Sequence, residues 1–316
     1  MTPTITHHRL DTRVVASGLE FPEGPVAMAD GSVLVVEMRR QTLSRVTPDG
    51  AVTVVAEVPG GPNGAAVAPD GGVVVANNGG AFDFIDLGGM LVTHQPSSNW
   101  RPGTVDRVDL SDGSVTTLVK GCAGRTLVAP NDLVMDGRGG FYFTDFGIQR
   151  DRDSDRTGVF WSSTDGADVR EVIRPMEFPN GVGLSPDGSI IYVAETFTGR
   201  VWSWSVTGAG EVASHPGLFA GGSLLYGAGG LVLFDSLSVD GHGWVCVGTL
   251  GLGEGGITAI SPDGSTVEHW HVDDPLVTNV CFAPGGAAVV YLTASAQGQL
   301  LVADWPRPGG VTAHNA

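Results

Sequence analysis

One short pattern recurs six times along the chain and constrains the fold more than any other feature. The copies are FPEGPVAMADG (21–31), GPNGAAVAPDG (61–71), APNDLVMDGRG (129–139), FPNGVGLSPDG (178–188), LFDSLSVDGHG (233–243) and VTNVCFAPGGA (277–287). Each copy is followed by a run of β-branched and aromatic residues, and Asp-Gly between such runs is a strong hairpin signal. A unit of strand, turn and strand that repeats at intervals of about 40 to 70 residues predicts a small sheet repeated around a ring.

The sequence therefore predicts an all-β fold, a six-bladed β-propeller of four-stranded antiparallel blades. The blades are expected to start near residues 21, 61, 129, 178, 233 and 277. The N-terminal segment HRLDTRVVASG (8–18) is expected to supply the outermost strand of the last blade and so to close the ring. No linker or shift in composition divides the chain, which favours a single domain over residues 1–316.

Charge and cysteine content exclude several classes of function. The chain has 34 acidic against 17 basic residues, a net charge of −17, which argues against a nucleic-acid partner. Its three cysteines are widely separated, which disfavours both thiolate zinc sites and a disulfide framework. The N-terminus has no apolar signal region and no apolar run is long enough for a membrane span. We therefore expect a soluble cytoplasmic protein with no membrane partner, and leave its oligomeric state open.

The third position of the six copies always carries a side-chain oxygen. These residues are Glu23, Asn63, Asn131, Asn180, Asp235 and Asn279, here called the oxygen ring. The first strand of each propeller blade lines the central channel, so equivalent positions should meet there. Buried unpaired carboxylates are costly, and a hard cation that takes six to eight oxygen ligands would resolve that cost. The alternative is that these residues only form turns at the blade starts.

The metal prediction is Ca²⁺ bound at the oxygen ring, where the carboxylates of Glu23 and Asp235 balance its charge, with Mg²⁺, Mn²⁺ or Zn²⁺ as alternatives. Asn63 and Asn279 could contact substrate or water as readily as the metal. Long insertions at 80–104, 146–158, 214–230 and 250–256 carry large apolar side chains, and such loops commonly build binding sites. Trp100 and Tyr226 are therefore also predicted to contact substrate.

Several of these motifs resemble those of the SMP-30/gluconolactonase/LRE-like (regucalcin-like) family. They are FPEGPV, PNDLVMD, FPNGVGLSPDG followed by IYVAE, and FDSLSVDGHGWV, in the expected order from about residue 20 to 300. The resemblance implies a six-bladed propeller and metal-dependent hydrolysis of a lactone. By motif, Glu23, Asn180 and Asp235 match the family's metal ligands, and Asn131 matches a position that binds substrate or metal. Asp235 and Asp132 each match an acid given the proton-transfer role.

The chain departs from the sugar lactonases of this family at one position. Those members carry an arginine two residues before the Asn of blade three, where this chain has Ala129. The difference disfavours a sugar-acid lactone. Together with the apolar insertions, it favours an aliphatic or aromatic lactone or ester.

The predicted mechanism is carbonyl polarisation by the metal and attack by water that a carboxylate activates. Asp132 and Asp235 both remain candidates for the base. Strict strand alternation would turn Asp132 away from Asn131, unless the segment after Pro130 is irregular.

Three alternatives stay open. One is a propeller that only binds a ligand or partner, and another is a metal-dependent isomerase or lyase on the same residues. The third is a histidine-assisted mechanism that uses His94 or His215 in the insertions. His269 and His271 share one face of an outer strand and are expected at the surface.

Overall fold

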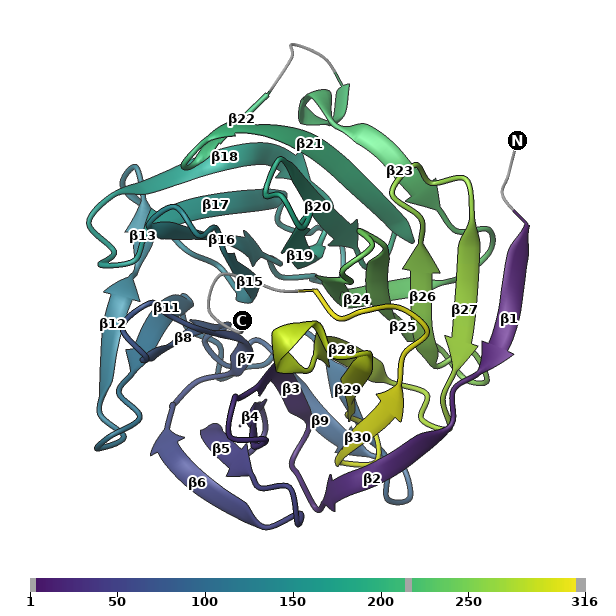
Figure 1. Ribbon diagram of the computed structural model, residues 1–316. Coiled ribbons are helices and arrows are strands. Elements are labelled where there is room, and N and C mark those ends of the chain that lie inside the picture. The colour runs from purple at the N-terminus through teal and green to yellow at the C-terminus, as the bar shows by residue number, and fades with distance from the viewer. Residues whose placement is uncertain (1–3, 214–217, 311–316) are drawn as a thin grey trace.

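Six antiparallel sheets surround a central channel, which confirms the predicted six-bladed β-propeller (Figure 1). The computed structural model describes residues 4–213 and 218–310. Neighbouring first strands contact one another in the order β3, β7, β15, β19, β24, β28 and back to β3. The channel is therefore lined by the six repeats that the sequence displays.

The strands of the six blades follow from inside to outside. Blade one has β3 (Pro22–Ala27), β4 (Val33–Glu37), β5 (Thr42–Val46) and β6 (Val52–Glu57). Blade two has β7 (Pro62–Val67), β8 (Val73–Asn77), β11 (Thr104–Val108) and β12 (Val115–Val119). Blade three has β15 (Pro130–Met135), β16 (Gly140–Asp145), β17 (Thr157–Ser163) and β18 (Val169–Met176).

Blade four has β19 (Pro179–Leu184), β20 (Ile190–Glu195) and β21 (Arg200–Gly208), with β22 (Glu211–Val212) and β23 (Ser223–Gly227) both paired to β21. Blade five has β24 (Leu233–Val239), β25 (Val245–Leu250), β26 (Gly256–Ile260) and β27 (Val267–His271). Blade six has β28 (Val277–Phe282), β29 (Val289–Ala294), β30 (Gln299–Asp304) and β2 (Thr12–Ser17). Two small ribbons lie outside the blades: β9 (Asp83–Asp86) with β10 (Leu91–His94), and β13 (Gly121–Cys122) with β14 (Arg125–Thr126). The described residues also include two short 3₁₀ turns, η1 (Leu218–Gly221) and η2 (Pro284–Gly286).

The blades are held together by apolar layers between neighbouring sheets. The second strands read as continuous apolar runs because both of their faces are covered; every residue of β4, β8 and β16 is buried. Between blades two and three, for example, Phe141 and Phe143 of β16 pack in one cluster with Val74 and Val105 of blade two. A rigid scaffold of this kind fixes the positions of the strand ends that surround the channel.

The N-terminal segment closes the ring as predicted, and it also contributes a second strand that the sequence did not indicate. β2 pairs antiparallel with β30, with Thr12 opposite Ala303. The preceding strand, β1 (Ile5–Arg9), pairs in parallel with β27 and so adds a fifth strand to blade five (Figure 1). Among the helical segments of residues 4–213 and 218–310, none has the length and apolar character of a membrane span.

Candidate active site

The oxygen ring is assembled at one end of the channel. Each member lies in the first strand of a different blade, and each is at least nine-tenths buried, from Glu23 at 2 % exposed to Asp235 at 9 %. Asp132, beside Asn131, is 6 % exposed. The structure thus brings together six oxygen-bearing side chains and one further carboxyl group where an apolar core would exclude them.

The same irregularity interrupts all six first strands at the ring. The register with the second strand shifts between Glu23 and Val26, Pro62 and Ala65, Pro130 and Leu133, Pro179 and Val182, Phe234 and Leu237, and Val277 and Asn279. A bulge of this type redirects side chains and breaks strict alternation. Asn131 and Asp132 are both buried as a result, so alternation does not turn Asp132 out toward solvent.

Glycines next to the ring let neighbouring first strands approach closely. A Cβ on Gly64 would lie 2.7 Å from the carbonyl oxygen of Asn131 and from Cα of Asp132. A Cβ on Gly181 would lie 2.7 Å from the carbonyl oxygen of Asp235. The Asn-Gly dipeptides of the repeats therefore fix the spacing between adjacent ring residues, in addition to forming turns.

Gly64→Ala is expected to lower stability by about 1–3 kcal/mol and to reduce any activity of the ring, because the new methyl group displaces the backbone at Asp132. Denaturant unfolding measures the change in stability. Gly229→Ala is the control, since a Cβ there meets no atom within 4 Å. Equal stability of the two variants would contradict this account of the spacing.

Three buried carboxyl groups share this site. Burial, and then the negative charge of Asp235, raises the pKa of Glu23 well above its usual value. Burial raises the pKa of Asp235 to about 7, with an added contribution from Asp132. Burial also raises the pKa of Asp132 to about 7, although Val182 N and Leu133 N donate to its carboxylate at 3.2 and 2.9 Å. None of the ion pairs among the described residues includes any of these three groups.

Two ring oxygens accept no hydrogen bond from any described residue. Oε2 of Glu23 and Oδ1 of Asn131 are buried and make no hydrogen bond among the described residues. An acceptor left in that state costs about 1–3 kcal/mol, and more when it is charged. A divalent cation removes this cost, because it supplies positive charge to carboxylates and bonds to amide oxygens. The donor set contains oxygen only, which suits Ca²⁺ or Mg²⁺ better than a transition metal.

Hydroxyl groups orient the side chain of Asn180, and a main-chain N–H donates to Asn279. Ser236 Oγ donates to Oδ1 of Asn180 at 3.3 Å, and Nδ2 of Asn180 donates to Thr196 Oγ1 at 3.1 Å. Asn279 accepts from Val280 N at 2.7 Å, and its side chain lowers the pKa of Glu23 against the larger effect of burial. Asn63 is 3 % exposed in the same ring. Nothing in the sequence indicated a role for Ser236 other than its place directly after Asp235.

Polar residues at the ends of four second strands hold the segments that lead into the ring. Glu37, Asn77, Asp145 and Glu195 each accept a hydrogen bond from a main-chain N–H located two or three residues before a ring member. Asp145 illustrates the pattern, since Val128 N and Ala129 N both donate to it at 2.7 Å. Burial raises the pKa of Asp145 to about 6. These residues position the main chain that leads into the ring.

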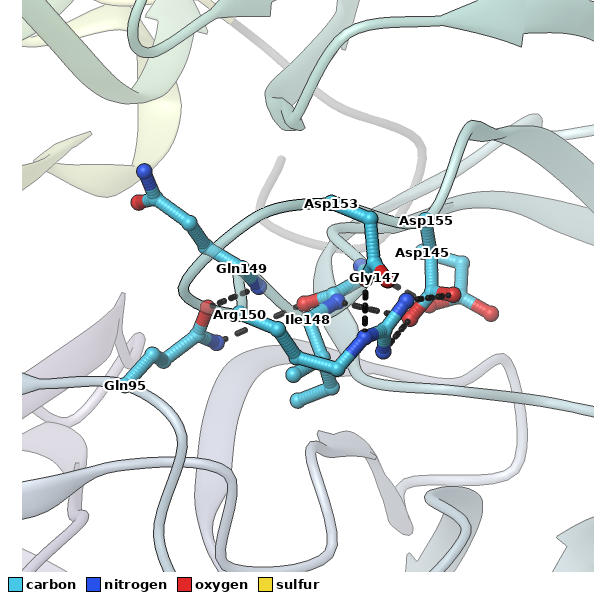
Figure 2. Close-up of polar contacts among 8 residues, drawn as sticks. All are labelled: Gln95, Asp145, Gly147, Ile148, Gln149, Arg150, Asp153 and Asp155. Atoms are coloured by element: carbon cyan, nitrogen blue, oxygen red, sulfur yellow. Dashed lines mark hydrogen bonds and ion pairs between the residues drawn. The ribbon is translucent and has the colours of Figure 1, made fainter.

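Two insertions meet beside the ring. Figure 2 shows Gln95 of the 80–104 insertion contacting the loop after β16: Gln95 accepts from Gln149 N at 3.0 Å and donates to Gly147 O at 3.4 Å. Within that loop the Arg150 guanidinium pairs with Asp155 at 2.8 Å. The insertions 80–104 and 146–158 thus pack against each other at blades two and three, and together they are called the cover.

The cover is apolar on its inner side. Ala129, which takes the place of the family's arginine, is fully buried and packs with Phe146, Phe178 and Trp100. Phe178 has a positive φ of 52° directly before the Pro-Asn of the ring, a strained conformation for an aromatic residue. Its ring contacts that of Phe197, which is 46 % exposed, at 4.7 Å between centroids. The region next to Asn131 is therefore apolar and aromatic.

Trp100 and Tyr226, the two aromatic residues predicted to contact substrate, occupy different places. Trp100 belongs to the apolar cover, and its indole N–H donates to Val128 O at 3.0 Å. Tyr226 lies on the outermost strand of blade four and packs against Phe234 in the core between blades four and five. The structure does not bring Tyr226 to the ring. Of the two histidines considered in the insertions, His94 is exposed on β10 and His215 lies outside the described residues.

The channel contains a cavity of about 630 Å³ on the side of the ring toward the C-terminal ends of the first strands. It extends from Asp132 and Asn279 along the first strands to the turns at their other ends, and Gly310 of the C-terminal segment lines it there. Asp132 thus lines a space large enough for water, whereas Asp235 does not line this cavity.

Comparison with known proteins gives consistent matches. The model of the SMP-30/Gluconolactonase/LRE-like region matches residues 21–296. A gluconolactonase of Zymomonas mobilis is 27 % identical over 308 residues, which cover 89 % of this chain and 78 % of that protein. A lactonase of Staphylococcus haemolyticus is 42 % identical over 71 residues, 22 % of this chain and 21 % of that one.

Solved structures show the same architecture. A gluconolactonase from Xanthomonas campestris superposes with a TM-score of 0.73 at 20 % identity, covering 97 % of this chain and 95 % of the other. A calcium-binding protein, regucalcin, from Agrobacterium tumefaciens superposes with a TM-score of 0.74 at 16 % identity, covering 98 % and 97 %. These likenesses support the fold, and the family match spans most of the sequence. The chain therefore belongs to the SMP-30/gluconolactonase/LRE-like family.

Proposed function

We propose that this protein is a divalent-metal-dependent lactonase that uses Ca²⁺. The observation that carries the proposal is the oxygen ring, with three buried carboxyl groups and two buried oxygens that have no donor. A propeller that only binds a partner has no need for such an arrangement. Relatives named gluconolactonase and lactonase, and a calcium-binding structural neighbour, support the same reading.

Glu23, Asn131, Asn180 and Asp235 would hold the ion, since they contribute two buried carboxylates and two buried amide oxygens to the ring. When bound there, a divalent cation polarises the carbonyl of a lactone and stabilises the oxyanion that forms on attack by water. Ser236 and Thr196 keep the Asn180 amide in one orientation through their hydrogen bonds. Asn63 and Asn279 offer polar contacts to substrate at the same ring.

We assign the proton transfer to Asp132. Burial raises the pKa of Asp132, to about 7 in the metal-free protein, which makes its carboxylate a stronger proton acceptor than that of an exposed aspartate. Main-chain N–H groups of Val182 and Leu133 fix the carboxylate, and Asp132 is one of the residues that line the channel cavity. Asp235, as a metal ligand, would have its lone pairs engaged. Replacing Asp132 should therefore impair the rate without removing the metal.

We propose an apolar lactone as the preferred substrate, aliphatic or aromatic in character. Ala129 leaves no cationic side chain at the position where sugar lactonases of the family carry arginine. Trp100, Phe146 and Phe178 instead surround it with apolar surface. An apolar substrate gains about 25 cal/mol for each Å² of its surface buried on such a wall, whereas sugar hydroxyl groups would lose their hydrogen bonds to water there.

The first test is hydrolysis of a panel of lactones, from a sugar δ-lactone to aliphatic and aryl γ-lactones. Activity is expected to vanish after exhaustive chelation and to return with Ca²⁺, and kcat/KM is expected to be at least about 10-fold higher for the apolar lactones. Initial rates with Ca²⁺, Mg²⁺, Mn²⁺ or Zn²⁺ restored separately measure both effects. A folded protein that hydrolyses no lactone with any of these ions would overturn the proposal and favour the isomerase, lyase or binding-only alternatives.

A further inference from the structure

Three histidines and one glutamate gather at the outer edge of blade five, away from the oxygen ring. His269 and His271 lie on β27, His7 on the adjacent strand β1, and Glu254 in the loop between β25 and β26 (Figure 1 shows the strands). Ligand atoms of Glu254, His269 and His271 all lie within 4.8 Å of one another. Nδ1 of His7 lies 3.1 Å from Nε2 of His271.

The backbone explains why these side chains converge. His269 and His271 are two residues apart on one strand, so they share a face. The parallel pairing of β1 with β27 places His7 opposite His269. The insertion at 250–256 then brings Glu254 over the same face, since Gly256 pairs with His271. The cluster therefore combines two neighbouring segments of blade five with β1, which is distant from them in sequence.

His269 is buried in a way that its position on an outer strand did not predict. It is 5 % exposed, and so the expectation of a surface residue is wrong for this histidine. One ring nitrogen, Nδ1, lies 3.1 Å from Thr258 Oγ1, which is itself 2.8 Å from Thr249 Oγ1. The other, Nε2, is buried and makes no hydrogen bond among the described residues.

The surroundings of that nitrogen suit a metal ligand. A metal-bound histidine almost always donates its other ring N–H to a hydrogen-bond acceptor, and Thr258 Oγ1 is placed to accept from Nδ1 of His269. A small cavity of about 60 Å³ is lined by His269, His7 and Glu254. Burial lowers the pKa of His269 to about 4, and the rings of His271 and His7 add to that effect, against an opposing contribution from the Glu254 main-chain carbonyl. The imidazole is therefore neutral at physiological pH, the form that binds metal.

We propose that His7, Glu254, His269 and His271 form a second metal site, for a Zn²⁺-type transition ion, that fastens the N-terminal strand to blade five. Imidazole nitrogens with one carboxylate are ligands that Zn²⁺ prefers, whereas the oxygen ring suits a harder cation. Two nitrogens bound tetrahedrally at ~2.0–2.1 Å from one ion stand about 3.3 Å apart, close to the 3.1 Å between His7 and His271.

The consequence is structural. β1 is an edge strand whose residues are mostly exposed, with Ile5 at 39 %, so its own packing holds it only weakly. A ligand on β1 and two on β27 would tie the strands together, and the free energy of metal binding would then oppose local opening of the N-terminus. The site is independent of the proposed lactonase activity.

The test uses the full chain after chelation, with Co²⁺ as a spectroscopic probe and Zn²⁺ as competitor. Wild type is expected to bind one Co²⁺ with visible d–d absorption that Zn²⁺ abolishes. Zn²⁺ at about 100 times its Kd should slow tryptic cleavage after Arg9 by up to about 100-fold, since cleavage requires β1 to open. His269→Ala/His271→Ala should lose both effects, and His242→Ala, at an exposed turn, should keep them.

His7→Ala/His271→Gln serves as a second variant, since it leaves the buried His269 intact and does not disturb the core. It should retain the wild-type denaturation midpoint in chelator and lose Zn²⁺ protection at Arg9. Ca²⁺-dependent rates should be unchanged in every one of these variants, which separates this site from the ring. Absence of Co²⁺ absorption in wild type, or unchanged Zn²⁺ protection in both double variants, would overturn the proposal.

Discussion

Asp235→Ala is expected to lower lactone hydrolysis by at least about 1,000-fold, equivalent to ~4 kcal/mol of transition-state stabilisation, and to weaken Ca²⁺ binding at the same time. The reason is that Asp235 supplies one of the two carboxylates assigned to the ion, and its loss leaves Glu23 as the sole charged ligand. Calorimetric titration of Ca²⁺ into the chelated protein, with initial rates at saturating Ca²⁺, measures both effects.

Two further variants sharpen this result. Asp132→Asn should lose rate by a similar factor while keeping Ca²⁺ affinity within about 10-fold, because that residue is assigned to the proton and not to the ion. Asp263→Asn, at an exposed turn of blade five, should behave like wild type. A fully active Asp235→Ala protein would refute the site assignment, and an Asp132→Asn protein that loses Ca²⁺ binding would return Asp235 to the role of base.

Raising the pH from 4 to 8 is expected to destabilise the metal-free protein by several kcal/mol. The pKa values of Asp132 and Asp235 are about 7 in the folded chain and 3.8 when unperturbed. Between these values the native state binds more protons than the unfolded state, so stability falls as pH rises through the window and levels off above it. Other titrating groups add their own slopes, so the quantity to read is the difference between wild type and Asp132→Asn.

Ca²⁺ should reverse that slope, because it binds the ionised carboxylates and competes with protons. Denaturant midpoints at several pH values, with chelator or with Ca²⁺, provide the measurement. In chelator, Asp132→Asn should show a shallower loss of stability than wild type, since one of the three raised pKa values at the ring is gone. Parallel pH profiles for the two proteins would show that Asp132 is not protonated in the folded metal-free state.

The repeats made the architecture predictable from sequence. Each copy contains an apolar strand with an Asp-Gly or Gly-rich turn, and these local signals are sufficient to count blades and to find their first strands. β2 was also predictable, since a ring of six sheets needs a closing strand and TRVVAS before the first repeat has the required composition. Conversely, β1 was missed because THHR has little strand propensity by itself and forms only against β27.

Part of the candidate site was predictable for the same reason. Equivalent positions in a closed ring of repeats must converge, so the sequence alone is sufficient to place Glu23, Asn180 and Asp235 together. The sequence named Asp132 as a candidate but left its orientation open, because strict alternation would turn it away from Asn131 and only the bulge after Pro130 explains its burial. Tyr226 was assigned to substrate from its position in an insertion, yet the fourth strand of blade four carries it into the core between blades.

The sequence by itself determined the number of blades, the six oxygen-bearing positions and the departure at Ala129, because each depends on local composition or on the symmetry of a repeat. The tertiary structure alone decided which oxygens lack donors, how the insertions pack over Ala129, and that His7 meets His269 across two strands that are 262 residues apart. These features depend on contacts between segments distant in the chain, and no local pattern of residues encodes such contacts.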